Sequence, residues 1–200
     1  MILTLSNLLE PEDVASVRAN LERAQPSDAA GLHARVHEAV LGDPLFLLGV
    51  QPRRMSAPAF ARYDAGMSMP PRGAAALPEG PQGLRADAGV VLFLSAADTY
   101  DGGALLLDTG WGAESIPGGA GNCVVHPASA RRGVAPVTRG TLWVACWWVQ
   151  SLVPDPRHRE ILYDLGWSAR WLEVFGQGET AEALSLWQCH ENLLRLWAGP

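Results

Sequence analysis

The sequence contains no lysine, because all 15 basic residues among its 200 residues are arginine. A catalytic lysine that forms a Schiff base with a carbonyl substrate is therefore excluded. Any site that binds an anion must use arginine, whose planar guanidinium group pairs with carboxylates and phosphates through two hydrogen bonds. Codon usage in a GC-rich genome is the simplest reason for the bias, and it leaves these chemical consequences unchanged.

Cysteines and long apolar runs are also scarce. The three cysteines, Cys123, Cys146 and Cys189, are too widely spaced for a disulfide framework or a zinc site. They indicate reduced thiols in a cytoplasmic protein. No run of about 18 apolar residues predicts a membrane span, and the first residues lack the basic leader of a signal peptide. The net charge of −6 argues against nucleic acid as a partner.

The remaining composition is that of a folded protein, with 48% hydrophobic and 18% charged residues. Helical spacing of apolar residues occurs near the N-terminus, and it returns after Pro154. We therefore predict three parts. They are an N-terminal helical region packed on the core (1–57), a β core (58–153) and a C-terminal helical extension (154–200).

Short apolar segments separated by Gly, Pro and Asp turns fill the middle of the chain, a pattern typical of a β-sandwich or barrel. We expect strands at 59–63, 89–94, 104–108, 122–126 and 141–149. Two turns are expected at 100–103 and 136–140. The stretch from Pro70 to Gly83 is rich in Pro, Gly and Ala and should form a loop.

Several ordered motifs carry a resemblance to a known family. They include Phe60-Ala-Arg-Tyr-Asp-Ala-Gly-Met, Leu92-Phe-Leu-Ser, Tyr100-Asp-Gly-Gly-Ala-Leu, Pro136-Val-Thr-Arg-Gly, Trp147-Trp-Val-Gln-Ser-Leu-Val and Ile161-Leu-Tyr-Asp-Leu. In this order and spacing the chain resembles the PKHD-type hydroxylases, relatives of prolyl hydroxylase that use iron(II) and 2-oxoglutarate. The resemblance implies a mainly β fold with flanking helices, built on a double-stranded β-helix core of the jelly-roll or cupin type.

The resemblance also implies where a metal site would lie. Such enzymes hold iron with a His-x-Asp pair and a distant His, which leaves room for 2-oxoglutarate and oxygen. The matching positions here are Arg72, Ala74 and Arg132, and the arginine that grips 2-oxoglutarate is matched by Leu142. Arginine has no lone pair to give to a metal. We therefore predict no metal and no cofactor at these degenerate positions.

An emptied site lined by arginine suits an anion, either a protein carboxylate or a small acidic ligand. Arg72 and Arg132 should approach each other, and Arg62 is a third candidate for anion or substrate binding. The alternative is that these side chains point into solvent. His126, Tyr63 and Asp87 are candidates for a catalytic acid or base, although a structural role is the simpler explanation for His126 and Asp87.

Two functional hypotheses follow for a protein repurposed away from iron and 2-oxoglutarate chemistry. In the first, it is a non-catalytic subunit of a heteromeric biosynthetic enzyme complex. Its tryptophans, including Trp111, Trp143, Trp147, Trp148 and Trp171, would suit a protein interface. In the second, it is a cofactor-independent enzyme that acts on a small anionic substrate, for example by ring closure with loss of an anionic group. Residual hydroxylase activity is the third alternative.

Overall fold

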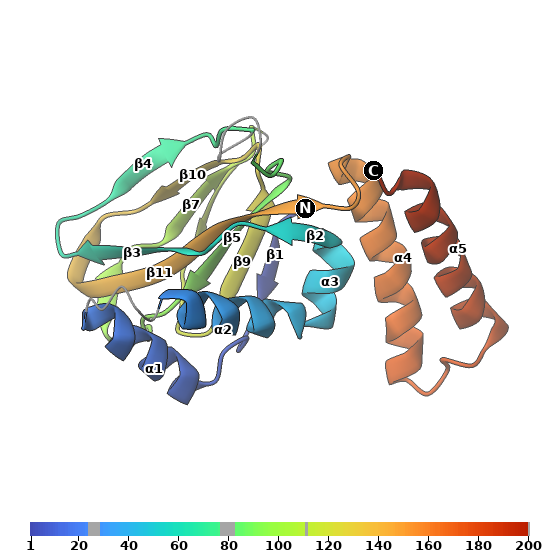
Figure 1. The fold of residues 1–200 in the computed structure, drawn as a ribbon, viewed down its shortest axis with the longest axis horizontal. Coiled ribbons are helices and arrows are strands. Elements are labelled where there is room, and N and C mark those ends of the chain that lie inside the picture. The colour runs from blue at the N-terminus through green and yellow to red at the C-terminus, as the bar shows by residue number, and fades with distance from the viewer. Residues whose placement is uncertain (24–28, 77–82, 111, 200) are drawn as a thin grey trace.

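The computed structural model describes residues 1–23, 29–76, 83–110 and 112–199. Two sheets face each other, with helices on one outer face and a helical hairpin at one end (Figure 1). The larger sheet has the order β1-β9-β5-β11-β2, and β3 and β6 also pair with β11. The smaller sheet has the order β4-β10-β7-β8. The predicted mainly β architecture with flanking helices is therefore confirmed.

The strands have the following bounds. They are β1 Leu3–Leu5, β2 Pro52–Met55, β3 Ala59–Asp64, β4 Met69–Arg72, β5 Ala88–Phe93, β6 Tyr100–Gly102, β7 Leu105–Asp108, β8 Ala113–Ile116, β9 Cys123–Pro127, β10 Arg131–Val134 and β11 Val137–Ser151. The helices are α1 Pro11–Glu22, α2 Ala29–Leu41, α3 Pro44–Val50, α4 Pro156–Val174 and α5 Ala181–Trp197.

Alternation along β11 divides the core in two. Leu142 and Val144 lie in the cluster between the two sheets, together with Leu107 of the smaller sheet. Ala145 and Trp147 point to the opposite face and pack against α1, α2 and α3. Because side chains of a strand alternate between faces, the even-numbered residues of β11 from Leu142 to Trp148 face the barrel interior, and the odd-numbered residues from Trp143 to Val149 face the helices.

The helices begin where the sequence offers capping groups. The Asp43 side chain accepts hydrogen bonds from the amides of Leu45 and Phe46 at the start of α3. The Thr180 hydroxyl accepts one hydrogen bond from the Ala183 amide at the start of α5. Across the part of the chain that the structure describes, none of the helices is both long and apolar enough to cross a bilayer.

Several short strands were missed by the sequence analysis. The expected loop from Pro70 to Gly83 begins instead as β4, which ends at Arg72, and residues 77–82 lie outside the described residues. Proline is tolerated in β4 because this strand lies at the edge of its sheet. The prediction of turns at 100–103 and 136–140 is also partly wrong. Most of these residues form strands, because β6 pairs with the first residues of β11, and the register of this pairing shifts between Val137 and Arg139.

Two more missed strands, β1 and β2, lie within residues 1–57 and join the larger sheet. Their three and four residues are too few to show a periodic pattern. The C-terminal helices form a hairpin beside α3 (Figure 1). The three-part division of the chain stays a prediction.

Candidate functional site

Antiparallel pairing of β4 and β10 places Arg72 directly opposite Arg132. Residues in such positions have side chains on the same face of the sheet, with Cβ atoms about 4.5–5.5 Å apart. The structure therefore brings together two arginines that the sequence separates by 60 positions. Arg72 is exposed and Arg132 is half-buried.

Neighbouring strands decide which way Arg132 points. In the pairing of β10 with β7, Arg132 is opposite Leu107, which is 1% exposed and belongs to the core between the sheets. Arg131 is opposite Asp108, and their side chains form an ion pair at 2.5 Å on the other face. Of these two adjacent arginines, Arg132 therefore faces the barrel interior and Arg131 faces outward.

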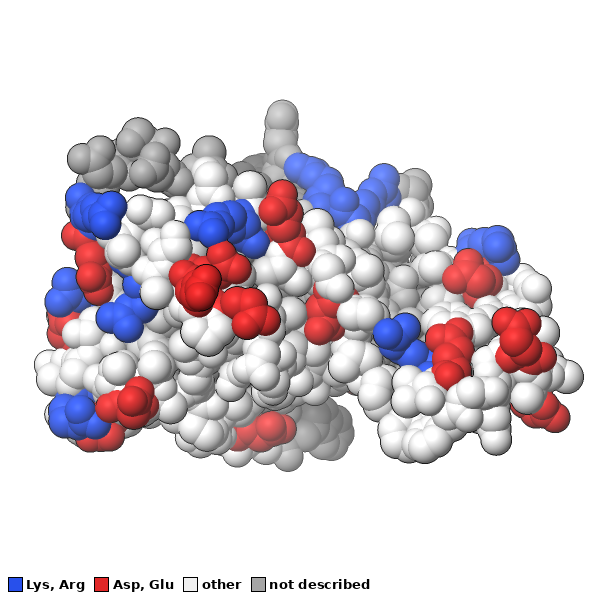
Figure 2. Space-filling model, turned by 90° about the horizontal axis from the view of Figure 1, so that it is seen from below, with Lys and Arg blue, Asp and Glu red and all other residues white. Residues whose placement is uncertain are grey.

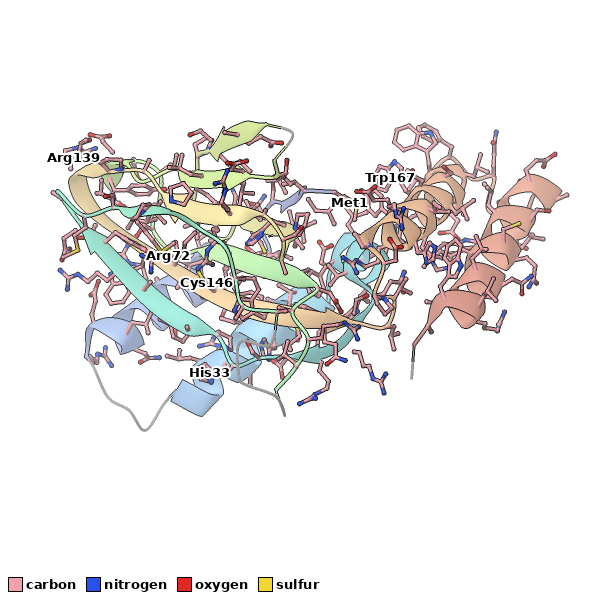
Figure 3. The ribbon with its side chains drawn as sticks, turned by 90° about the horizontal axis from the view of Figure 1, so that it is seen from above. Met1, His33, Arg72, Arg139, Cys146 and Trp167 are labelled. Carbon is pink, nitrogen blue, oxygen red and sulfur yellow. The ribbon has the colours of Figure 1, made fainter. Side chains whose placement is uncertain are left out.

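Aromatic and sulfur-containing side chains surround Arg132. Its guanidinium carbon lies 5.9 Å from the centre of the Trp148 ring, within the range of a cation–π interaction. Burial raises the pKa of the Cys146 thiol, and the adjacent Arg132 opposes this rise. Figure 3 shows Arg72 and Cys146 near each other on the barrel, far from Trp167 on the helical hairpin.

Tyr63 lies on β3, opposite Leu142 of β11, and completes this group. Its hydroxyl points to the Met69 sulfur at 3.7 Å, a weak acceptor. Burial and the Cys146 thiol raise the pKa of the Tyr63 phenol, against smaller opposing effects of Arg132 and Arg72. Tyr63 is therefore a protonated donor at neutral pH. We call Arg72, Arg132, Tyr63, Cys146 and Trp148 the arginine-pair cluster.

The other two positions singled out by the resemblance carry no polar side chain. Leu142 is fully buried in the core between the sheets, where it packs near Gly103. Ala74 follows β4 and lies outside regular structure. Neither residue can bind an anion or a metal through its side chain.

Arg62, the third candidate for anion binding, lies on the other face of β3 from Tyr63. Its guanidinium carbon is 5.7 Å from the Trp143 ring, and it forms an ion pair with Asp64 at 2.9 Å. Because Trp143 belongs to the odd-numbered face of β11, Arg62 is directed away from the barrel interior. The structure does not bring it together with Arg72 and Arg132.

His126 is 1% exposed and packs edge-on against Trp148. Its Nδ1 atom lies 2.9 Å from the carbonyl oxygen of Pro127, which places the proton on Nδ1. The Nε2 atom is buried without a hydrogen-bond partner among the described residues, and a Cβ atom on Gly89 would lie 2.5 Å from it. Burial lowers the pKa of His126 to about 4. His126 is thus a neutral core residue beside the arginine-pair cluster.

Asp87 holds structural elements together. Its carboxylate accepts two hydrogen bonds from Arg85, at 2.8 and 2.9 Å, and one from the Ser151 amide at 2.8 Å. Its side chain is 6% exposed, so these contacts are shielded from water. The structure therefore places Asp87 at the join of β5 and β11, apart from Tyr63.

Sequence analysis missed Cys146 and Trp148 as members of the site. The signal that could have found them is the alternation along β11, which puts Leu142, Val144, Cys146 and Trp148 on one face. The alternation alone does not say which face points into the barrel, and the contact of Trp148 with Arg132 and the pairing of Leu142 with Tyr63 decide this.

Comparisons with known proteins place the chain in a family, although no family model matches it. It is 32% identical, over an alignment of 226 positions that includes gaps, to a PKHD-type hydroxylase from Burkholderia ambifaria, and the alignment covers 99% of both chains. A PKHD-type hydroxylase from Acaryochloris marina is 35% identical over 222 residues, covering 99% of this chain and 100% of the relative. The chain belongs to the PKHD-type hydroxylase family. Both alignments are longer than the chain, so these PKHD-type relatives carry residues that it lacks.

Solved structures agree on the fold. A viral collagen prolyl hydroxylase from Paramecium Bursaria Chlorella virus-1 has a TM-score of 0.57 and 12% identity, covering 75% of this chain and 95% of that one. A Pseudomonas putida prolyl-4-hydroxylase has a TM-score of 0.54 and 18% identity, covering 74% and 88%. At such low identity they show the fold alone, and they confirm the predicted jelly-roll core of this PKHD-type protein.

The PKHD-type relatives also correct our functional prediction. We expected a protein repurposed away from hydroxylation, either a subunit of a complex or a cofactor-independent enzyme. That prediction is contradicted, because the relatives that match nearly the whole chain are named hydroxylases. The prediction treated four positions as evidence about the whole protein. Four positions describe one site, whereas the match to the relatives extends over 99% of the chain.

The tryptophans lie in different surroundings. Trp147 is 2% exposed in the core, whereas Trp171 is 53% exposed on α4, and Trp111 lies outside the described residues. Trp167, Trp171 and Phe175 follow one another along the exposed face of α4. Trp167 and Trp171 also line a hollow with Leu172 and Leu186, between α4 and α5.

Proposed function

We propose that this protein functions in hydroxylation, the activity for which its PKHD-type relatives are named. The observation that carries this proposal is the match over 99% of the chain and 99% or 100% of those relatives. The solved neighbours agree with it in fold, and their names include prolyl hydroxylases and a 2OG-Fe(II) oxygenase from Burkholderia pseudomallei. A peptide that contains proline is the substrate class that the neighbours' names suggest.

We further propose that the family's iron ligands are replaced in this chain. Non-haem iron hydroxylases hold the metal with two histidines and one carboxylate, and Arg72, Ala74 and Arg132 do not fit such a centre. The described residues contain no group of three His, Cys, Asp or Glu side chains that could hold a metal ion. Hydroxylation by this chain would therefore require metal ligands other than these three residues.

The residues of the barrel interior support binding of a substrate. Phe93, Val144 and Leu142 are almost fully buried and would exclude water from the inner end of the barrel. Tyr63 offers a hydroxyl proton, and Arg132 offers guanidinium N–H groups at the half-buried edge of this apolar surface. The cluster can thus orient a ligand that has an apolar part and an acceptor group.

Product analysis tests the proposed function. The full chain is incubated with iron(II), 2-oxoglutarate and a proline-containing peptide in air, and hydroxylated peptide and succinate are measured by mass spectrometry. The Acaryochloris marina relative serves as the positive control. We expect hydroxylated peptide above the level found without protein. Absence of product from this chain, under conditions in which the relative forms it, would overturn the proposal.

A protein partner and a cytoplasmic location stay predictions. The exposed aromatic residues of α4 are compatible with a partner, because Trp is enriched at the centres of interfaces. Pull-down from the host extract with the full chain, compared with Trp171→Ala, measures whether this face binds a protein.

A further inference from the structure

Arg72 and Arg132 place two positive charges directly opposite each other in the pair of β4 and β10. Like charges directly opposite each other in an antiparallel pair destabilise the sheet, and this pair also lies partly out of water. A protein that keeps such a pair gains from a negative charge between the two guanidinium groups.

The chain's own carboxylates do not supply that charge within the described ranges. Asp108 pairs with Arg131, Asp64 with Arg62 and Asp101 with Arg139. Across residues 1–23, 29–76, 83–110 and 112–199, no ion pair includes Arg72 or Arg132. Elsewhere on the surface acidic and basic side chains lie beside each other, as the face in Figure 2 shows.

The other members of the cluster offer donors and apolar surface. Among the described residues, the Tyr63 hydroxyl donates only to the weakly accepting Met69 sulfur, so a stronger acceptor can replace it. The half-buried Trp148 ring lies beside the Arg132 guanidinium and offers apolar surface next to the two charges. The site therefore has several hydrogen-bond donors, two positive charges and little that can accept a hydrogen bond.

We propose that the arginine-pair cluster binds the carboxylate of a small organic acid between Arg72 and Arg132. A planar carboxylate offers two oxygens, each with lone pairs for guanidinium N–H groups, and Tyr63 supplies a further donor. The carbon chain of the acid lies against the Trp148 ring. This apolar surface favours an organic acid over inorganic phosphate, which gains nothing from it.

This inference goes beyond the proposed function, because binding of an acid requires neither iron nor turnover. It also gives a physical reason for the mismatch at the predicted metal positions. The pairing of β4 with β10 brings two guanidinium groups together at the predicted metal positions. Histidine and aspartate at these positions would bind a cation, whereas two guanidinium groups bind an anion.

Calorimetric titration of the full chain with succinate, without added metal, tests the proposal. We expect saturable binding with about one site per chain, the number that a single guanidinium pair provides. Arg72→Gln and Arg132→Gln should each weaken succinate binding about 10- to 100-fold, since a hydrogen bond to a charged group contributes roughly 1.5–3 kcal/mol. Arg131→Gln is the matched control and should leave the affinity unchanged, because Arg131 faces outward and pairs with Asp108.

Three results would overturn the inference. They are no saturable binding of succinate, an equal loss of affinity in Arg131→Gln, and tighter binding of inorganic phosphate than of succinate. Circular dichroism of each variant establishes that the fold is intact. The two proposals fail separately, because succinate binding without any hydroxylated product overturns only the proposed function. Product formation with no succinate binding overturns only this inference.

Discussion

Arg72 and Arg132 are direct cross-strand neighbours in the antiparallel pair of β4 and β10. The resemblance to the hydroxylases assigns both positions to metal-binding histidines. The structure shows that these positions do lie together, on the barrel-facing side of the smaller sheet. The side chains at both positions are arginines.

Removal of one charge from this pair should stabilise the ligand-free protein. We expect Arg72→Gln to raise the free energy of unfolding by about 0.2–1 kcal/mol at low ionic strength, because it relieves like-charge repulsion. At about 0.5 M salt the gain should shrink, since screening weakens the repulsion. Urea denaturation at both salt concentrations measures this. Arg54→Gln is the control, because Arg54 lies opposite the uncharged Gln150; an equal gain in that variant would contradict the interpretation.

Restoring ligands at three positions should create a metal site. We expect Arg72→His, Ala74→Asp and Arg132→His together to bind about one equivalent of cobalt(II), used as a spectroscopic substitute for iron(II), because two histidines and a carboxylate would then face one another. Visible absorption of bound cobalt measures this without any assay of activity. The wild-type chain should not show the absorption of cobalt held by two histidines and a carboxylate, because none of these three positions carries such a ligand.

The control for this triple variant carries the second histidine at position 131 and keeps Arg132. Arg131→His, combined with Arg72→His and Ala74→Asp, puts the second histidine on the outer face and should not bind cobalt in the same way. If the two triple variants behave alike while both are folded, the equivalence of Arg132 to a metal ligand is wrong.

His126 should make the protein less stable in mild acid. Its pKa falls from the usual 6.5 to about 4 on folding, because burial disfavours the charged imidazole. Between these pH values the unfolded chain binds a proton that the folded chain does not. The free energy of unfolding is therefore highest above pH 6.5 and decreases as the pH falls towards 4, by on the order of 3 kcal/mol.

His126→Gln tests this pH dependence. Urea denaturation at several pH values should show a shallower decrease for the variant, whatever its stability at neutral pH. An NMR titration of the imidazole in the wild-type chain measures the pKa itself. A midpoint close to 6.5 would show that His126 does not cause the effect.

Asp87 should matter for stability more than an exposed acidic residue. We expect Asp87→Ala to lower the free energy of unfolding by about 2–3 kcal/mol, because the Ser151 amide and Arg85 lose a shielded charged acceptor. Asp101→Ala is the matched control, since Asp101 also pairs with one arginine but is 56% exposed; this variant should change stability little. Equal losses in the two variants would remove the structural role assigned to Asp87.

Most of the core elements could be predicted from local patterns. The strands at 59–64 and 88–93 and the helices of the C-terminal hairpin follow from apolar spacing and from capping residues such as Thr180. The missed strands, including β1 and β4, are short and receive their backbone hydrogen bonds from distant partners. No local pattern specifies such a partner, so their existence follows from tertiary pairing.

The sequence by itself determined which side chains are available: arginine without lysine, no histidine between Met67 and Asp87, and leucine at position 142. It also carried the family resemblance that the comparisons confirmed. Only the tertiary structure decided which of these residues meet. Strand register turned Arg132 inward beside Trp148 and turned Arg131 and Arg62 outward to Asp108 and Asp64. The physical reason is that a strand alternates its faces with every residue, so a shift of one position would exchange the inner and outer sets.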